Sequence, residues 1–150
     1  GPERMGAPIQ AFTRISPEPI TLRCSVQNPE VVVVLDPSLL SVVNVLEGMK
    51  PGGIIIVNSP DSAEKIRKEI NAGKEIKVFT VNATRVAIDT IGKPIPNTPM
   101  IGAFIKATEI VTLENVTEHL KKSFGKKFSK EIVDGNIEAV KRAFEEVTSG

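Results

Sequence analysis

The sequence contains few of the side chains on which enzymes most often rely. It has one cysteine, Cys24, and one histidine, His119, and it has neither tryptophan nor tyrosine. A single cysteine cannot form an intramolecular disulfide and cannot by itself supply a cysteine-based metal site. Cys24 falls on the apolar side of an alternating segment, so we interpret it as a small buried side chain rather than a reactive thiol.

Motifs for catalysis are also missing. No Ser-His-Asp elbow, zinc-ligand spacing or Walker-type loop is present. His119 lies on the polar side of a predicted helix, where a solvent-facing histidine is favoured over a catalytic one. We therefore predict no catalytic residue and no metal site in this chain.

Neither charge sign is in excess, and long apolar runs are absent. The chain has 19 Lys and Arg against 18 Asp and Glu, so its net charge of +1 does not favour nucleic acid or a membrane surface as a partner. No apolar run reaches the length that spans a membrane, and we expect a cytoplasmic protein. The 150 residues are enough for one domain, 1–150, with a substantial core.

Short runs of branched apolar residues are abundant, and they predict the fold. Residues 31–35 show no alternation, which is typical of a strand buried on both sides. Asp36 and Pro37 then predict a capped helix over 37–47. Similar strands are expected over 54–58 and 76–81, the first followed by Ser59-Pro60 as a second cap-and-proline start. The resulting β-α-β-α-β-α order predicts an α/β fold with a mainly parallel sheet and helices on both faces.

The two ends of the chain depart from this pattern. Alternating apolar residues over 9–15 and 20–26 predict an antiparallel hairpin at an edge of the sheet. The last third predicts C-terminal helices: an almost wholly apolar one over 100–107, one capped by Thr112, and a final one. The side chains that we expect to face inward on the final helix are Ile132, Val133, Ile137, Val140, Phe144 and Val147.

Three polar residues end predicted strands or begin the helices after them: Asp36, Asn58 and Asn82. Ligands bind at the carboxyl edge of open α/β sheets, so these side chains could converge on one ligand. Each can also serve as a helix cap or a strand-end turn residue, and the sequence favours capping.

Five lysines gather around Gly125, namely Lys121, Lys122, Lys126, Lys127 and Lys130. A solvated face is the plainest interpretation of such a cluster. The alternative is a surface for a phosphate-bearing ligand or for an acidic partner.

Several separated segments resemble one family. The opening GPERMGAPIQAF, the segment NPEVVVVLD over 28–36 and the segment IPNTPMIGA over 95–103 are similar to the gamma subunit of 2-oxoacid:ferredoxin oxidoreductases. The tail, from Phe124 to Val147, resembles the pyruvate branch, pyruvate synthase. The resemblance spans essentially the whole chain. The family usually begins with a strand, a Gly-rich turn and a helix that precede this segment, so we interpret the chain as a piece of a longer protein and assign no phosphate-loop residue.

The resemblance implies a subunit of an enzyme that converts pyruvate to acetyl-CoA and reduces ferredoxin. It implies alpha, beta and delta partner subunits, with thiamine diphosphate, Mg²⁺, iron–sulfur clusters and coenzyme A used by the complex. One cysteine cannot hold a cluster, and we expect this chain to bind no cofactor itself and to be inactive alone. The resemblance also implies that the lysine cluster binds either coenzyme A phosphates or an acidic surface of another subunit.

The Pro-rich connector over 93–99 and the apolar helix after it are predicted to form an assembly element. The helix would begin at a cap provided by Asn97 or Thr98. Coverage of the helix by this chain's own sheet and final helix is an equally good interpretation. The residues of the possible subunit interface are Asn97, Thr98, Met100, Gly102 and Phe104.

Other functions remain open at this stage. The chain could be a free-standing α/β domain that binds a small ligand, or it could belong to an oxidoreductase for a branched 2-oxoacid. The turn over 46–53 also resembles one in S-adenosylmethionine-dependent methyltransferases, although their glycine motif is absent.

Overall fold

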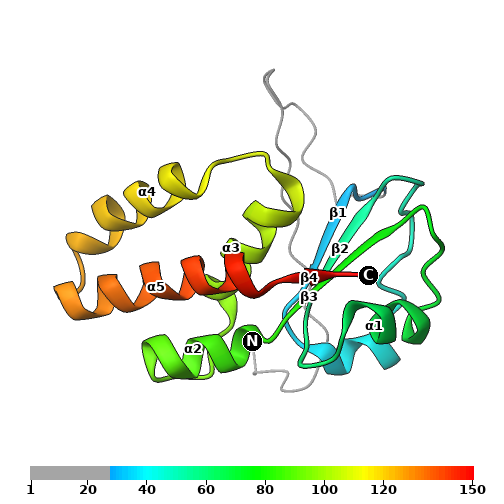
Figure 1. The fold of residues 1–150 in the computed structure, drawn as a ribbon, viewed down its shortest axis with the longest axis horizontal. Helices are drawn as coiled ribbons and strands as arrows, with labels where there is room; N and C mark the ends of the chain where they lie inside the picture. The colour runs from blue at the N-terminus through cyan, green and yellow to red at the C-terminus, as the bar shows by residue number, and fades with distance from the viewer. Residues whose placement is uncertain (1–27) are drawn as a thin grey trace, which may run out of the picture.

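The computed structural model describes residues 28–150, which contain a four-stranded sheet in the order β1-β2-β3-β4 (Figure 1). β1 (Val31–Val34), β2 (Ile54–Asn58) and β3 (Lys77–Val81) are parallel, and β4 (Thr148–Ser149) runs antiparallel to β3. The predicted α/β class and mainly parallel sheet are confirmed. The predicted edge hairpin and Cys24 lie outside the described residues.

Helices cover both faces of this sheet. One face packs against α1 (Ala63–Glu69) and the short 3-10 helix η1 (Pro37–Ser41), and its centre is formed by Ile55 and Val57. On the other face, Ile56 packs against α3 (Asn97–Thr108) and α5 (Lys130–Glu146). Successive residues of β2 therefore point to opposite faces, as a strand requires.

A helical layer extends beyond the sheet. α2 (Ala83–Ile91), α3 and α4 (Leu113–Gly125) all pack against α5. A separate apolar cluster joins α3, α4 and α5, away from the strands, and consists of Ile105, Leu120, Val133, Ile137 and Val140. Figure 1 shows that α4 and the first half of α5 consequently form a helical hairpin that projects from the body of the molecule.

Side-chain caps begin most of the helices. Asn82 and Thr112 cap α2 and α4 as predicted, since their side-chain oxygens accept hydrogen bonds from the amides of Arg85 and Asn115. The prediction for Ser59 is wrong, because its hydroxyl accepts from the Asp61 amide within a turn while Ser62 caps α1. α3 begins after Pro96, with no side-chain cap from Asn97 or Thr98.

The predicted helix over 37–47 is wrong beyond Ser41. Only the 3-10 turn forms, and Val42 is 70% exposed instead of facing inward. Consecutive β-branched residues lower helix propensity here. The Asn44 side chain also accepts a hydrogen bond of 3.2 Å from the Leu46 amide, a local turn that competes with a helix.

Two further predictions about burial are wrong. β1 is the edge strand among the described residues, so Val33 is 41% exposed although Val34 is buried. In α5, Ile132 lies on the exposed side of the first turn, beside the buried Val133. Val147 is half-buried against the core, as predicted, although it falls just after the helix, where the chain straightens into β4.

Candidate functional site

Asn58 is the central polar residue at the carboxyl edge of the sheet. It is 4% exposed, and its amide group donates hydrogen bonds to the Leu35 carbonyl (2.9 Å) and the Thr84 hydroxyl (2.8 Å). Its side-chain oxygen accepts from the amides of Ala83 (2.9 Å) and Thr84 (3.3 Å). Asn58 therefore joins the end of β1 to the start of α2, and it uses both donors and both acceptor positions to do so.

Asp36 and Asn82 are exposed at the same edge, and each caps the segment that follows it. The Asp36 carboxylate accepts a 2.9 Å hydrogen bond from the Ser38 amide, and hydrogen bonding by the Ser38 side chain and backbone lowers the pKa of Asp36. The Asn82 side chain accepts a 3.2 Å hydrogen bond from the Arg85 amide. All three edge residues thus have the structural roles that the sequence favours, and contact of any of them with a ligand stays a prediction.

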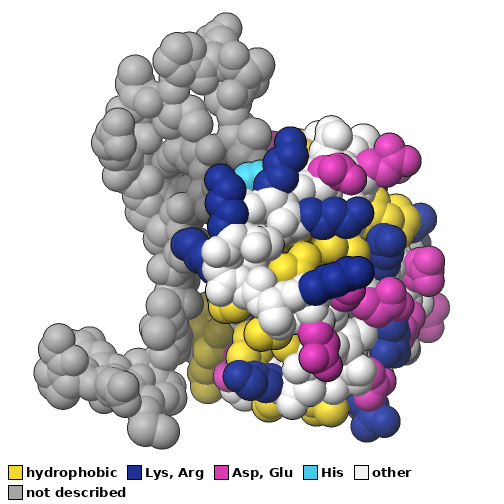
Figure 2. Space-filling view, turned by 90° about the vertical axis from the view of Figure 1, so that its left-hand side faces the viewer, with side chains coloured by type: hydrophobic (Ala, Val, Ile, Leu, Met, Phe, Trp, Pro, Cys, Tyr) yellow, Lys and Arg dark blue, Asp and Glu magenta, His cyan; other side chains and the backbone are white. Residues whose placement is uncertain are grey.

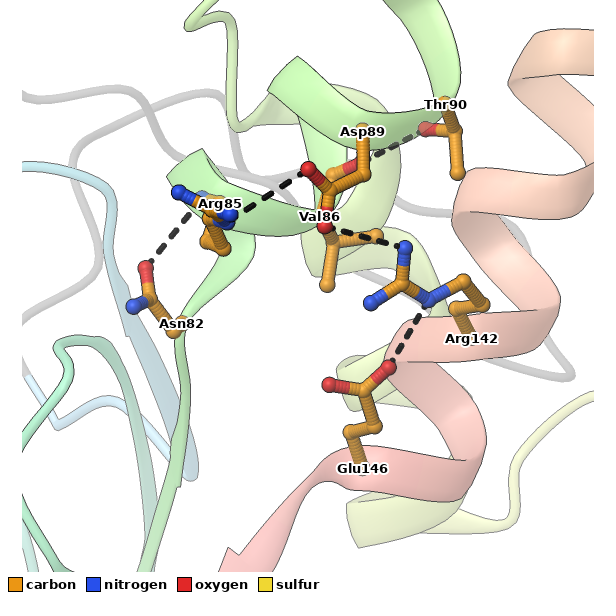
Figure 3. A network of polar contacts seen from close by, with 7 residues as sticks. All are labelled: Asn82, Arg85, Val86, Asp89, Thr90, Arg142 and Glu146. Atoms are coloured by element: carbon orange, nitrogen blue, oxygen red, sulfur yellow. Dashed lines mark hydrogen bonds and ion pairs between the residues drawn. The ribbon is translucent and has the colours of Figure 1, made fainter.

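A polar network that the sequence did not predict links α2 to α5 (Figure 3). Asp89 on α2 forms an ion pair with Arg85 of the same helix (3.4 Å) and a second ion pair with Arg142 on α5 (3.3 Å). Arg142 also donates a 2.9 Å hydrogen bond to Glu146. The bond to Glu146, followed by that to Asp89, raises the pKa of Arg142. The network holds its charges in place rather than preparing a proton transfer.

The five predicted lysines lie together at the projecting end of the α4–α5 hairpin. They are all exposed, and two of them, Lys121 and Lys130, line a hollow of about 450 Å³ together with Gly125, Phe128, Val133 and Asp134. Figure 2 views this end of the molecule and shows hydrophobic side chains between basic ones. The sequence indicated the lysines but not the apolar surface between them.

The five residues of the possible interface differ in burial. Met100 is 2% exposed and Gly102 is buried against α5, so this chain covers both. Asn97 is exposed, and Thr98 and Phe104 are half-buried. The structure thus accounts for the apolar character of α3 at two of the five positions, and an interface through the other three stays a prediction.

His119 is exposed on α4, where its Nε2 lies 3.2 Å from the Ser123 hydroxyl. Within residues 28–150, no three or more His, Cys, Asp or Glu side chains are grouped so that they could hold a metal ion. None of the helices in this part of the chain is long and apolar enough to cross a membrane.

Residues 1–146 match the family described as pyruvate ferredoxin/flavodoxin oxidoreductase. The pyruvate synthase subunit PorC of Thermotoga maritima is 46% identical over 147 residues, which cover 98% of this chain and 75% of that protein. The common subunit gamma of the pyruvate/ketoisovalerate oxidoreductases of Pyrococcus abyssi is 44% identical over 145 residues, which cover 97% of this chain and 76% of that protein.

The fold has a similar counterpart among crystal structures. Pyruvate oxidoreductase subunit PORC of Thermotoga maritima matches with a TM-score of 0.74 and 40% sequence identity. The match covers 83% of this chain and 67% of that one. Sequence and fold therefore indicate the same set of relatives.

Proposed function

This chain belongs to the pyruvate ferredoxin/flavodoxin oxidoreductase family, and from that premise we propose that it is the gamma-type subunit of a pyruvate synthase. The observation that carries the proposal is 46% identity to a pyruvate synthase subunit across 98% of this chain. The assembled enzyme would oxidise pyruvate to acetyl-CoA and carbon dioxide and pass the electrons to ferredoxin. We propose a cytoplasmic location for this enzyme.

The role proposed for this chain is structural support rather than chemistry. The shifted pKa values of Asp36 and Arg142 both move away from neutrality, so neither group is prepared for proton transfer. The described residues offer no cluster of ligands that fits Mg²⁺ or an iron–sulfur cluster. We therefore propose that thiamine diphosphate, Mg²⁺ and the clusters are held by alpha, beta and delta subunits.

A second candidate function has a specific observation in its favour. Relatives that are 44% identical are named as common subunits of pyruvate and ketoisovalerate oxidoreductases. A chain with a structural role can serve both enzymes, because it need not recognise the 2-oxoacid. A free-standing ligand-binding domain has less support, since Asp36, Asn58 and Asn82 already have structural hydrogen bonds.

Reconstitution tests the proposal. The chain would be co-expressed with the genes for the other subunits, and reduction of a viologen dye would be followed with pyruvate and coenzyme A. We expect activity from the complex and none from this chain alone. Full activity of a complex that lacks this chain would refute the subunit role, and activity of the chain alone would refute the structural one. Replacing pyruvate by 2-ketoisovalerate tests the shared-subunit alternative.

A further inference from the structure

The projecting end of the α4–α5 hairpin, residues 121–132, has an excess of positive charge. Acidic side chains in the described part of the chain do not neutralise this excess. Five of its twelve residues are lysine, and Glu131 is the single acidic residue among them. Within residues 28–150, only Lys121 of the five forms an ion pair, a long one of 3.8 Å to Glu118. The hairpin end, as we call residues 121–132, is therefore a basic surface.

Helix stability explains only part of this charge. Lys121 and Lys122 lie in the last turns of α4 and Lys126 caps it, where the helix dipole favours cations. Lys130, however, is the first residue of α5, where the same dipole disfavours a cation. Because Lys130 does not stabilise α5, its presence beside four other lysines indicates that it contacts another molecule.

An exposed apolar surface lies within the basic one. Phe128, in the connection between α4 and α5, is 47% exposed, and Ile132, in the first turn of α5, is 46% exposed. The Phe128 and Phe124 rings pack edge to face, with ring centroids 5.4 Å apart and planes at 66°. An apolar centre with a charged rim is the usual composition of a protein–protein interface, in which aromatic residues are enriched.

The hollow beside Phe128 favours a protein over a small phosphate ligand. Lys121 and Lys130 line it, but so do the carboxylate of Asp134 and the apolar Val133. A phosphate placed in the hollow would be repelled by Asp134 and would lose part of its own hydration against the apolar side chains of Phe128 and Val133. A partner that places an apolar side chain there and carboxylates around it would match every lining group except Asp134.

We propose that the hairpin end binds an acidic face of another subunit of the same enzyme, with an apolar side chain of that subunit packed against Phe128. The hypothesis rests on the proposed function, because it takes the partner from the same complex. The rigid packing of α4 on α5 through Leu120, Val133 and Ile137 holds the surface ready for binding. Charge attraction speeds encounter, and the aromatic contact provides most of the affinity.

Charge reversal in the assembled enzyme tests the proposal. The complex would be purified through a tag on this chain, with Lys126→Glu and Lys127→Glu together, and dissociation would be measured by dilution. We expect the apparent dissociation constant of this subunit to rise about tenfold at about 0.1 M salt, and the difference to shrink at higher salt. The milder Lys126→Gln and Lys127→Gln pair should give a smaller rise in the same direction. Phe128→Ala should weaken the complex at all salt concentrations.

Lys50→Glu with Lys74→Glu is the matched control. Both lysines are exposed, near the amino ends of β2 and β3, and their reversal gives the same change in net charge. The control should leave assembly unchanged, and thermal melting of each variant would establish that it is folded. An equal loss of affinity in the control variant would refute the proposal, because the change in net charge alone would then explain the weaker assembly.

Two other results would also refute the proposal. One is assembly of the hairpin variants with wild-type affinity at every salt concentration. The other is unchanged assembly with a raised KM for coenzyme A, which would assign the lysines to a phosphate-bearing ligand. Failure of the wild-type chain to purify with any other subunit would instead refute the proposed function, so the two failures are distinguishable.

Discussion

Gly102 of α3 lies directly against the backbone carbonyl of Val140 on α5. A Cβ atom built on Gly102 would overlap that oxygen and would lie 2.9 Å from the Phe144 amide nitrogen. Neither atom can rotate away, since both belong to the backbone of α5. The absence of a side chain at residue 102 therefore sets how closely the two helices approach.

Replacing Gly102 by alanine should destabilise the chain by about 1–3 kcal/mol, because α3 and α5 must separate to admit the methyl group. Gly125→Ala is the control, since that helical glycine has nothing within 4 Å of an added Cβ. The control should gain up to about 1 kcal/mol from helix propensity. Urea unfolding measures both changes. Equal stability of the two variants would contradict the close approach.

The sequence predicted the parts of the fold that depend on local chemistry. Short apolar runs identified β1, β2 and β3, and the polar residues Asn82 and Thr112 identified the starts of α2 and α4. These signals are strong because burial and capping act on residues that are neighbours in the chain.

The features that the sequence missed depend on distant contacts. β4 has two residues, too few for a periodic pattern, and forms because Thr148 pairs with Thr80 of β3. Arg67 supports it by donating a 3.0 Å hydrogen bond from Nε to the Gly150 carbonyl. The lysine cluster was visible because its members are close in sequence, whereas the exposure of Phe128 at its centre follows from how α4 packs on α5.

Asn58→Ala should cost about 3 kcal/mol of unfolding free energy. The substitution leaves the buried Ala83 amide without its partner, which costs about 1–3 kcal/mol, and it also removes the bond to the partly buried Leu35 carbonyl. Asn82→Ala is the matched control, because this exposed residue makes one capping bond worth about 1 kcal/mol. Chemical denaturation of the two variants provides the comparison. Similar losses at both positions would show that Asn58 is only a cap.

The stability of the chain at acidic pH should depend on whether Asp36 is charged. Its folded-state pKa is lowered by the hydrogen bonds from Ser38, so its contribution to stability is present above the unfolded-state pKa of about 4 and is lost as pH falls through the folded-state value. Asp36→Asn can still accept the Ser38 hydrogen bond but does not titrate. Between about pH 5 and pH 3, the wild-type chain should therefore lose more stability than the variant. If the unfolding free energies of the two proteins changed equally with pH across this range, the proposed contribution of the Asp36 charge would be refuted.

The ion pairs of Arg142 should stabilise the packing of α2 on α5 by a small, salt-dependent amount. Arg142 bonds Asp89 across the helix boundary and Glu146 within α5, and it is only partly exposed, so Arg142→Ala should cost about 1 kcal/mol. Arg85→Ala is the control, since Arg85 pairs with Asp89 within one helix, and it should cost about 0.3–0.5 kcal/mol. A double-mutant cycle with Asp89→Ala isolates the contact between helices. A coupling free energy of zero at low salt would show that the close approach of Gly135 on α5 to the Thr90 carbonyl of α2, and not this network, joins the two helices.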